Sequence, residues 1–178
     1  MRANFFTRTT GSNSRGFTLF ELVVVISVVS VLAFFALDRY YRLLVEVERT
    51  AMEHNLGVMR SALAMEVTAS LVEGDRAAVQ RLIGSNPMDL LVELPHNYDG
   101  SVSSLTARTV APGRWYFDAS GRQLVYKVQH QLYLESKSRN SGSIAFTVEP
   151  LYTQRMSGRY LAGLRIQPVN EYRWLTID

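Results

Sequence analysis

Residues 17–37 read FTLFELVVVISVVSVLAFFAL, a run of 21 residues in which Glu21 is the single charged side chain. As a helix this run would extend roughly 31 Å, about the thickness of the hydrocarbon core of a bilayer. Valine disfavours helices in water, but in lipid the backbone must satisfy its own hydrogen bonds. The run therefore predicts a membrane-spanning helix.

A cleavable secretory signal is the main alternative for this run. Such a signal has an apolar region of about 7–15 residues and ends in an A-x-A-like site. This run is longer and ends FFALDR at residues 34–39, which does not favour removal at that end. Arginines flank the run on both sides, so the charge count leaves the orientation of the helix open.

The net charge of +3 and the pI near 9.3 raise the possibility of a nucleic-acid partner. Residues 1–16 hold three arginines and no acid, so they carry the whole excess. Later arginines alternate with glutamate and aspartate, a pattern typical of a solvated surface, and no nucleic-acid partner is predicted. The lack of cysteine excludes disulfides, thiol nucleophiles and thiolate metal sites.

Glu21 is the informative side chain of the apolar run. An acid within a membrane segment costs free energy, so its presence there indicates a functional role. The alternative is an acid that reaches the headgroups, or is protonated, and has no further role.

The junction Gly16-Phe17-Thr18-Leu19-Phe20-Glu21 follows a short basic leader and opens the apolar run. It closely resembles the prepilin signal of type IV pilins and type II secretion pseudopilins. The resemblance implies that prepilin peptidase, a membrane aspartyl peptidase, cuts between Gly16 and Phe17 and methylates the new amine of Phe17. It also implies a cytoplasmic amino terminus and a periplasmic head.

Glu21 is expected to act in filament assembly. Cleavage would create a cation at Phe17, four residues before Glu21 and on the same helix face, and that amine or a neighbouring subunit's amine would neutralise the carboxylate. One departure from the family pattern concerns Ser30 and Asp38, where many members carry a glycine and a helix-breaking proline. The helix melting proposed for such filaments is therefore less supported in this chain.

The helical pattern continues through residues 38–72, where the chain is amphipathic, and should end near Val72 before Glu73-Gly74-Asp75. Two adjoining apolar stripes share this half. The first consists of Leu44, Val47, Ala51, Val58, Ala62 and Met65. The second consists of Met52, Leu56, Met59 and Leu63. Charged side chains fall largely between them, so both stripes are predicted to pack on a head.

Residues 73–178 are predicted to form that head. Asp75 and Asn86 read as helix caps, before short helices at residues 76–83 and 88–92. Residues 95–112 read as a loop with a turn at 97–100, and residues 114–118 and 123–128 as a hairpin. The later strand candidates are residues 131–134, 144–151, 161–167 and 172–177. The order indicates a pilin-like α+β fold, in which the amphipathic half of the helix covers a small antiparallel sheet.

No catalytic or cofactor motif accompanies these elements. The histidines lack metal-ligand spacing, and His54 reads as a helix-surface residue. Glu149, Glu171 and Asp178 are too sparse for the calcium loop that major secretion pseudopilins carry, so no metal is predicted. Trp115 and Tyr116 read as packed strand aromatics rather than as a binding surface.

The predicted protein is thus a non-catalytic minor pilin or minor pseudopilin of a type IV pilus or type II secretion filament. Its expected partners are prepilin peptidase, other pilins or pseudopilins, the inner-membrane assembly platform and the lipid bilayer. It is expected to span the inner membrane once before it enters a filament. The alternative is a periplasmic binding module that keeps an uncut anchor and does not polymerise.

Overall fold

The computed structural model describes residues 17–102, 109–136, 142–155 and 158–175. The chain divides into two compact units, the N-terminal unit (Met1–Tyr41) and the C-terminal unit (Arg42–Asp178). The predicted leader, residues 1–16, lies outside the described residues.

Helix α1 (Leu19–Val72) begins within the apolar run and ends where the sequence predicts. Thr18 precedes it, and the Thr18 hydroxyl oxygen accepts a hydrogen bond from the N–H of Glu21 at 3.2 Å. A threonine that accepts from the third residue of a helix is an N-cap. The helix therefore starts two residues later than Phe17, because Thr18 takes the capping position.

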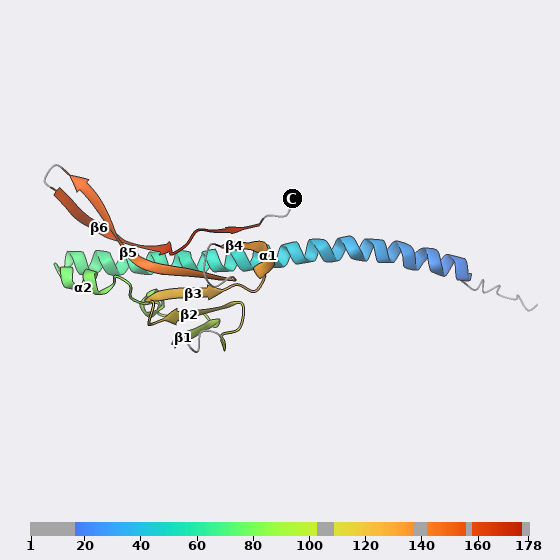
Figure 1. Cartoon of the computed structure of the whole chain (residues 1–178), viewed down its shortest axis with the longest axis horizontal. Helices are drawn as coiled ribbons and strands as arrows, with labels where there is room; N and C mark the ends of the chain where they lie inside the picture. The colour runs from blue at the N-terminus through green and yellow to red at the C-terminus, as the bar shows by residue number, and fades with distance from the viewer. Residues whose placement is uncertain (1–16, 103–108, 137–141, 156–157, 176–178) are drawn as a thin grey trace, which may run out of the picture. The chain divides into compact units, whose positions relative to one another are not determined.

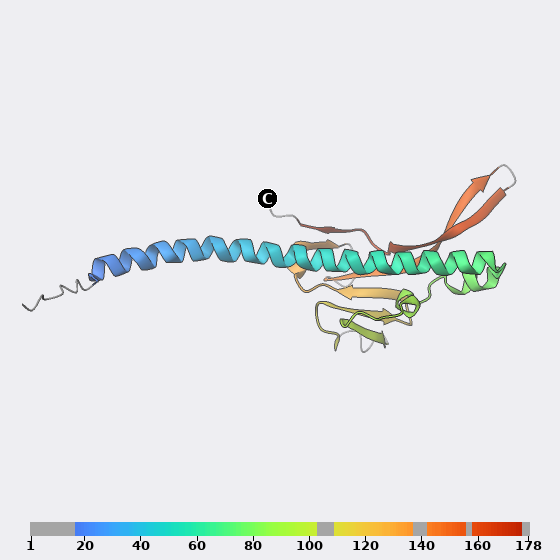
Figure 2. The same ribbon diagram turned by 180° about the vertical axis from the view of Figure 1, so that it is seen from behind.

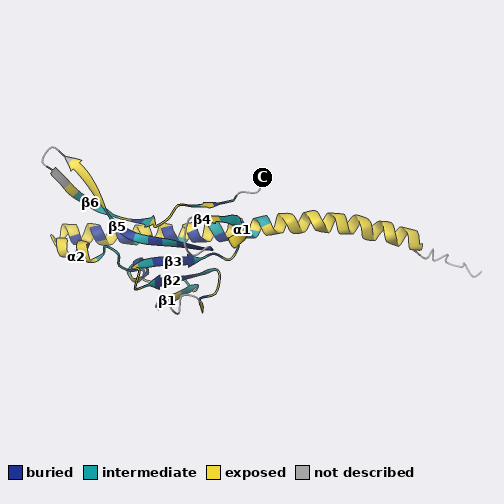
Figure 3. Cartoon of the chain, in the orientation of Figure 1, coloured by how far each residue is buried: buried dark blue, intermediate teal, exposed yellow. Residues whose placement is uncertain are grey.

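In the N-terminal unit every described residue is exposed, from Phe17 through the helical residues to Tyr41 (Figure 3). The two serines of the run satisfy their hydroxyls within the helix. Ser27 donates to the carbonyl of Val23 at 2.8 Å, and Ser30 donates to the carbonyl of Ile26 at 2.7 Å. An uncovered apolar helix without unsatisfied hydroxyls suits a lipid or protein surrounding rather than water.

In the C-terminal unit one face of α1 is buried. Its members recur every three or four residues, the spacing of one helix face. They are Val45, Glu48, Met52, Leu56, Met59, Leu63, Val67 and Ser70. The predicted second stripe is thereby confirmed as core.

The first predicted stripe is not core, which corrects the sequence interpretation. Val47, Val58 and Met65 are 57%, 44% and 75% exposed. Both stripes are apolar, but a single sheet covers only one side of a helix. The sequence pattern alone does not say which side.

The sheet of the C-terminal unit has five strands in the order β1-β2-β3-β5-β6, and a two-stranded sheet pairs β4 with β7. Figure 1 shows the strands beside α1, and Figure 2 shows them from behind. The strands are β1 (Tyr98–Val102), β2 (Arg114–Asp118), β3 (Gln123–Lys127), β4 (Leu134–Ser136), β5 (Ser143–Arg155), β6 (Gly158–Pro168) and β7 (Tyr172–Trp174). The α+β prediction is confirmed: a long N-terminal helix packs on a small, mostly antiparallel sheet.

The predicted β2–β3 hairpin is confirmed, with Arg114 paired to Lys127 and Asp118 paired to Gln123. The loop predicted at residues 95–112 is wrong in part, because it contains β1, which pairs with β2 in parallel. The residues that were predicted to form a turn at 97–100 instead coincide with a shift in the register between β1 and β2. Gly100 sits there with φ +82°, a left-handed conformation that glycine adopts without strain.

The strand predicted at residues 131–134 is also wrong. Gln131–Tyr133 forms a 3-10 helix, η3, and β4 begins only at Leu134. The later candidates are confirmed with longer or shorter bounds as β5, β6 and β7. Both predicted short helices are present as well, α2 (Arg76–Arg81) and the 3-10 helix η1 (Pro87–Leu90), with Asp75 and Asn86 as their N-caps.

The core of the C-terminal unit lies between the buried face of α1 and the sheet. Trp115 is fully buried at its centre, 4.8 Å from Tyr126 and 5.9 Å from Phe146 between ring centroids. Tyr116 points to the other face of the sheet and is also buried. The prediction that Trp115 and Tyr116 are packed strand aromatics is confirmed.

Candidate functional site

The first candidate site is the start of α1. Phe17 is described, exposed and outside the helix, Thr18 caps the helix, and Glu21 lies in its first turn. Gly16, the other residue of the predicted cleavage site, lies outside the described residues. The sequence analysis missed the role of Thr18, although T-x-x-E before an apolar run is the signature of a capping box.

The geometry at the start of α1 explains why a negative charge is stable there. The amide groups of the first helical turn give the end of the helix a partial positive charge, which stabilises an acid such as Glu21. A new amine at Phe17 would lie at the same end and add a full positive charge. Glu21 is therefore placed where a carboxylate compensates both. This geometry differs from the predicted one, since Phe17 precedes the cap and does not share a helix face with Glu21.

The helix that follows is long and apolar enough to cross a membrane, and among the described residues it is the single helix that meets both criteria. None of the residues in its most apolar 18-residue stretch is buried in the structure. Glu21 is the one acid within the exposed apolar run.

The second candidate site is a buried carboxylate that the sequence analysis did not single out. Glu48 lies on the covered face of α1 and is only 8% exposed. It accepts hydrogen bonds from the hydroxyl of Tyr126 at 3.0 Å, from the backbone N–H of Gln129 at 2.6 Å and from that of His130 at 3.0 Å. The ring Nδ1 of His130 lies 2.5 Å from Oε2 of Glu48, the same oxygen that accepts from the backbone N–H of His130.

These contacts fasten α1 to the segment that follows β3. At 2.5 Å, Nδ1 of His130 and Oε2 of Glu48 share one hydrogen bond. Burial, with the neighbouring carboxylate of Glu48, raises the pKa of the Tyr126 phenol above its usual value. The phenol therefore stays protonated and donates to Glu48. The signal for this site was present in the sequence, because Glu48 interrupts the apolar spacing of Val45 and Met52.

The remaining histidines take no part in these sites. His54 is exposed on α1, as predicted, and His96 is exposed in the segment before β1. Within the described ranges no group of three histidine, aspartate or glutamate side chains is placed to hold a metal ion. Because Asp178 lies outside those ranges, the prediction that calcium is not bound stays a prediction.

The comparisons with known proteins bear on the N-terminal site. A family model for the prokaryotic N-terminal methylation motif matches residues 11–37. This motif is the signature of type IV pilin and pseudopilin precursors, so residues 11–37 of the chain are similar to the start of such a precursor. No curated protein and no solved structure matches the chain.

Proposed function

We propose that the chain is a minor pilin or minor pseudopilin, a non-catalytic subunit of a type IV pilus or a type II secretion filament. The observation that carries the proposal is the methylation motif at residues 11–37, which runs directly into an exposed apolar helix. Its partners would be prepilin peptidase, other pilins or pseudopilins and the inner-membrane assembly platform. Before assembly the helix would anchor the chain in the inner membrane, with a cytoplasmic amino terminus and a periplasmic C-terminal unit.

In the first step the peptidase hydrolyses the peptide bond between Gly16 and Phe17. Water adds across that bond, which leaves a carboxylate on Gly16 and an amine on Phe17, the amine that is then methylated. The loss of residues 1–16 removes three arginines and no acid, so the formal net charge falls from +3 to zero. Thr18 remains in the mature chain and still caps the helix.

In the second step the exposed helix packs against other subunits in the filament. An unpaired carboxylate in an apolar filament core would be costly, so Glu21 must meet a cation there. The amine of Phe17, on the same or a neighbouring subunit, is the cation that the cleavage creates. This pairing would fix the axial register of the subunit.

The first experiment identifies the mature amino terminus. Full-length protein is isolated from cells with and without prepilin peptidase, and its amino-terminal peptide and isoelectric point are measured. A chain that begins at methylated Phe17, with a lower isoelectric point, only when the peptidase is present is the expected result. An intact leader in both strains would instead indicate an uncut, non-polymerising anchor and would refute the proposal.

The second experiment tests assembly. Glu21→Ala is compared with Glu66→Ala, in which an exposed acid of α1 is removed from the C-terminal unit. Filaments sheared from cells should contain the Glu66 variant at the wild-type level and the Glu21 variant at a small fraction of it. Equal incorporation of both variants would show that Glu21 does not pair during assembly.

A further inference from the structure

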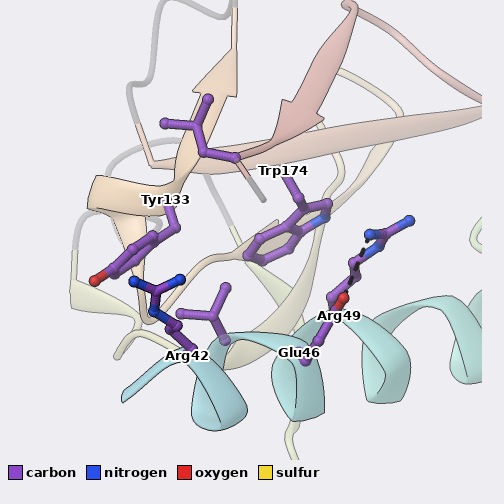
Figure 4. A pocket seen from close by; sticks show the side chains of 7 residues that line it. Arg42, Glu46, Arg49, Tyr133 and Trp174 are labelled. Atoms are coloured by element: carbon purple, nitrogen blue, oxygen red, sulfur yellow. Dashed lines mark ion pairs between the residues drawn. The ribbon is translucent and has the colours of Figure 1, made fainter. Parts of the chain in front are cut away.

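A small cavity of about 80 Å³ lies within the C-terminal unit, between α1 and the end of β7. Figure 4 shows the side chains around it. Arg42, Glu46 and Arg49 line it from α1, and Trp174 and Tyr133 line it from the side of the small sheet. A buried water needs about 10–15 Å³ of such space, so the cavity has room for a group of five to eight non-hydrogen atoms.

Trp174, which lines this cavity, carries a hydrogen-bond donor without a partner in the described part of the chain. Its side chain is more than nine-tenths buried, with 8% of the residue exposed. Among the described residues its indole N–H is one of two buried side-chain polar atoms without a hydrogen-bond partner, and the other is the indole N–H of Trp115. Figure 4 shows the nitrogen-bearing edge of Trp174 turned toward the side of Arg49. A buried N–H without a partner is unfavourable, so an acceptor at this edge would stabilise the site.

The charges around the cavity have both signs. Arg49 donates through Nε to Glu53 at 2.9 Å, and its Nη1 lies 3.7 Å from the carboxylate of Glu46. The contact with Glu53 raises the pKa of the Arg49 guanidinium, which therefore stays charged. A guanidinium carries five N–H donors, so further donors remain for an anion. The carboxylate of Glu46 is in turn an acceptor for a cation.

This combination suits a zwitterion better than a simple anion. A phosphate would accept from guanidinium and indole N–H groups, which are its usual donors in proteins. Free phosphate alone would be repelled by Glu46, whereas a phosphate joined to an ammonium group would use that carboxylate. Phosphoethanolamine has eight non-hydrogen atoms, which is the upper end of the range that this volume allows.

If the apolar run spans the bilayer, which is the part of the proposed function that the inference uses, the length of the chain keeps Arg42, one of the residues that line this cavity, near the membrane surface. Arg42 follows Leu37, the last residue of the run, by five residues. Even a fully extended chain of five residues spans at most about 18 Å. Tryptophan, tyrosine and arginine are also typical of the headgroup layer.

We propose that this cavity binds the phosphoethanolamine headgroup of a membrane phospholipid. The phosphate accepts hydrogen bonds from the indole N–H of Trp174 and from the guanidinium of Arg49, and the ammonium group donates to Glu46. The arginine at position 42 adds a second positive charge at the rim. The bound lipid holds the C-terminal unit at the membrane until the subunit leaves for the filament.

The test observes the indole N–H directly. Full-length protein in detergent micelles is labelled with ¹⁵N-indole tryptophan, and its two indole signals are assigned with Trp115→Phe. The soluble probes are glycerophosphoethanolamine, glycerophosphocholine and inorganic phosphate. Glycerophosphoethanolamine should move the Trp174 proton signal downfield and leave the Trp115 signal in place, which also reports that the core stays folded.

Variants then assign the contacts. Arg49→Gln should weaken binding of glycerophosphoethanolamine about tenfold or more, since a hydrogen bond to a charged group is lost. Glu46→Gln should remove the preference for glycerophosphoethanolamine over glycerophosphocholine. Arg173→Gln is the matched control, because that arginine neighbours Trp174 in sequence but pairs with Glu135 outside the cavity, and it should bind as the wild type does.

A final arm uses nanodiscs of phosphatidylcholine with and without phosphatidylethanolamine, and the Trp174 signal should move only with the latter. A Trp174 signal that ignores every probe would overturn the proposal. Equal effects of inorganic phosphate or of glycerophosphocholine would overturn it as well, since the site would then be a general anion site. A shift that depends on protein concentration without any probe would show that a second copy fills the cavity. The soluble-probe arm needs neither cleavage nor assembly, so its failure is distinguishable from failure of the proposed function.

Discussion

Replacing Glu48 by alanine should be among the most destabilising single changes in the C-terminal unit. The carboxylate is buried on α1 and accepts from three groups near the end of β3: the hydroxyl of Tyr126, the N–H of Gln129 and the N–H of His130. The Nδ1 of His130 adds a fourth contact at 2.5 Å. Glu48→Ala leaves these groups, which are buried or partly buried around the carboxylate, without their acceptor.

The magnitude follows from the kind of contact that is lost. A hydrogen bond to a charged group contributes about 1.5–3 kcal/mol, and a buried donor that loses its acceptor adds a desolvation penalty of about 1–3 kcal/mol. The four contacts share one carboxylate and are not additive. We therefore expect a loss of about 4 kcal/mol in the free energy of unfolding. For a unit of this size that corresponds to a fall of about 12 °C in Tm.

The assay is urea unfolding of the full-length protein in detergent, followed by near-UV circular dichroism of its buried aromatic side chains. Glu53→Ala is the matched control, because Glu53 lies on the same helix but is exposed and forms only a surface ion pair with Arg49. Such pairs contribute about 0–1 kcal/mol. Glu48→Gln, which keeps one acceptor oxygen, should fall between the two. If Glu48→Ala and Glu53→Ala unfold at the same urea concentration, the reasoning about the buried carboxylate is refuted.

Two further predictions concern the core and its tyrosines. Met59→Ala should lower the free energy of unfolding by about 2–5 kcal/mol, because Met59 is fully buried. Met65→Ala, on the exposed stripe, should change it by less than about 0.5 kcal/mol. Equal urea midpoints for the two variants would contradict the assignment of the buried face. Burial raises the pKa of Tyr126 and Tyr172 above the ordinary value of 10.0. The unfolded chain therefore loses these protons first, so the contribution of the two tyrosines to stability is fully present below pH 10 and falls as the pH rises further. Urea midpoints between pH 8 and 12 check this, and Tyr126→Phe should flatten the decline; a wild-type midpoint that does not change over that range would argue against it.

Local signals in the sequence determined much of this protein. A run of 21 residues with a single charge predicts the apolar helix, and its end near Val72 follows from the glycine two residues later. The β2–β3 hairpin and the caps at Asp75 and Asn86 were also predicted. These features depend on residues within a few positions of one another, whose spacing limits the backbone directly.

Contacts between distant residues were decided only by the tertiary structure. Two stripes of α1 are apolar, and the position of the sheet selects the one that contains Met59. Part of the expected loop is the strand β1, which pairs in parallel with β2. This tertiary pairing overrides the local preference of residues 97–100 for a turn.

The sites outside the N-terminal motif also depend on contacts between residues that are distant in the sequence. Glu48 meets Tyr126 across 78 positions in the chain, and no spacing rule relates them. The cavity at Trp174 likewise joins the start of the C-terminal unit to its last described strand. The sequence therefore determined the helix that anchors this protein, through hydrophobicity and local hydrogen bonding. The tertiary structure decided which of its side chains the C-terminal unit uses, because burial depends on what packs opposite each face.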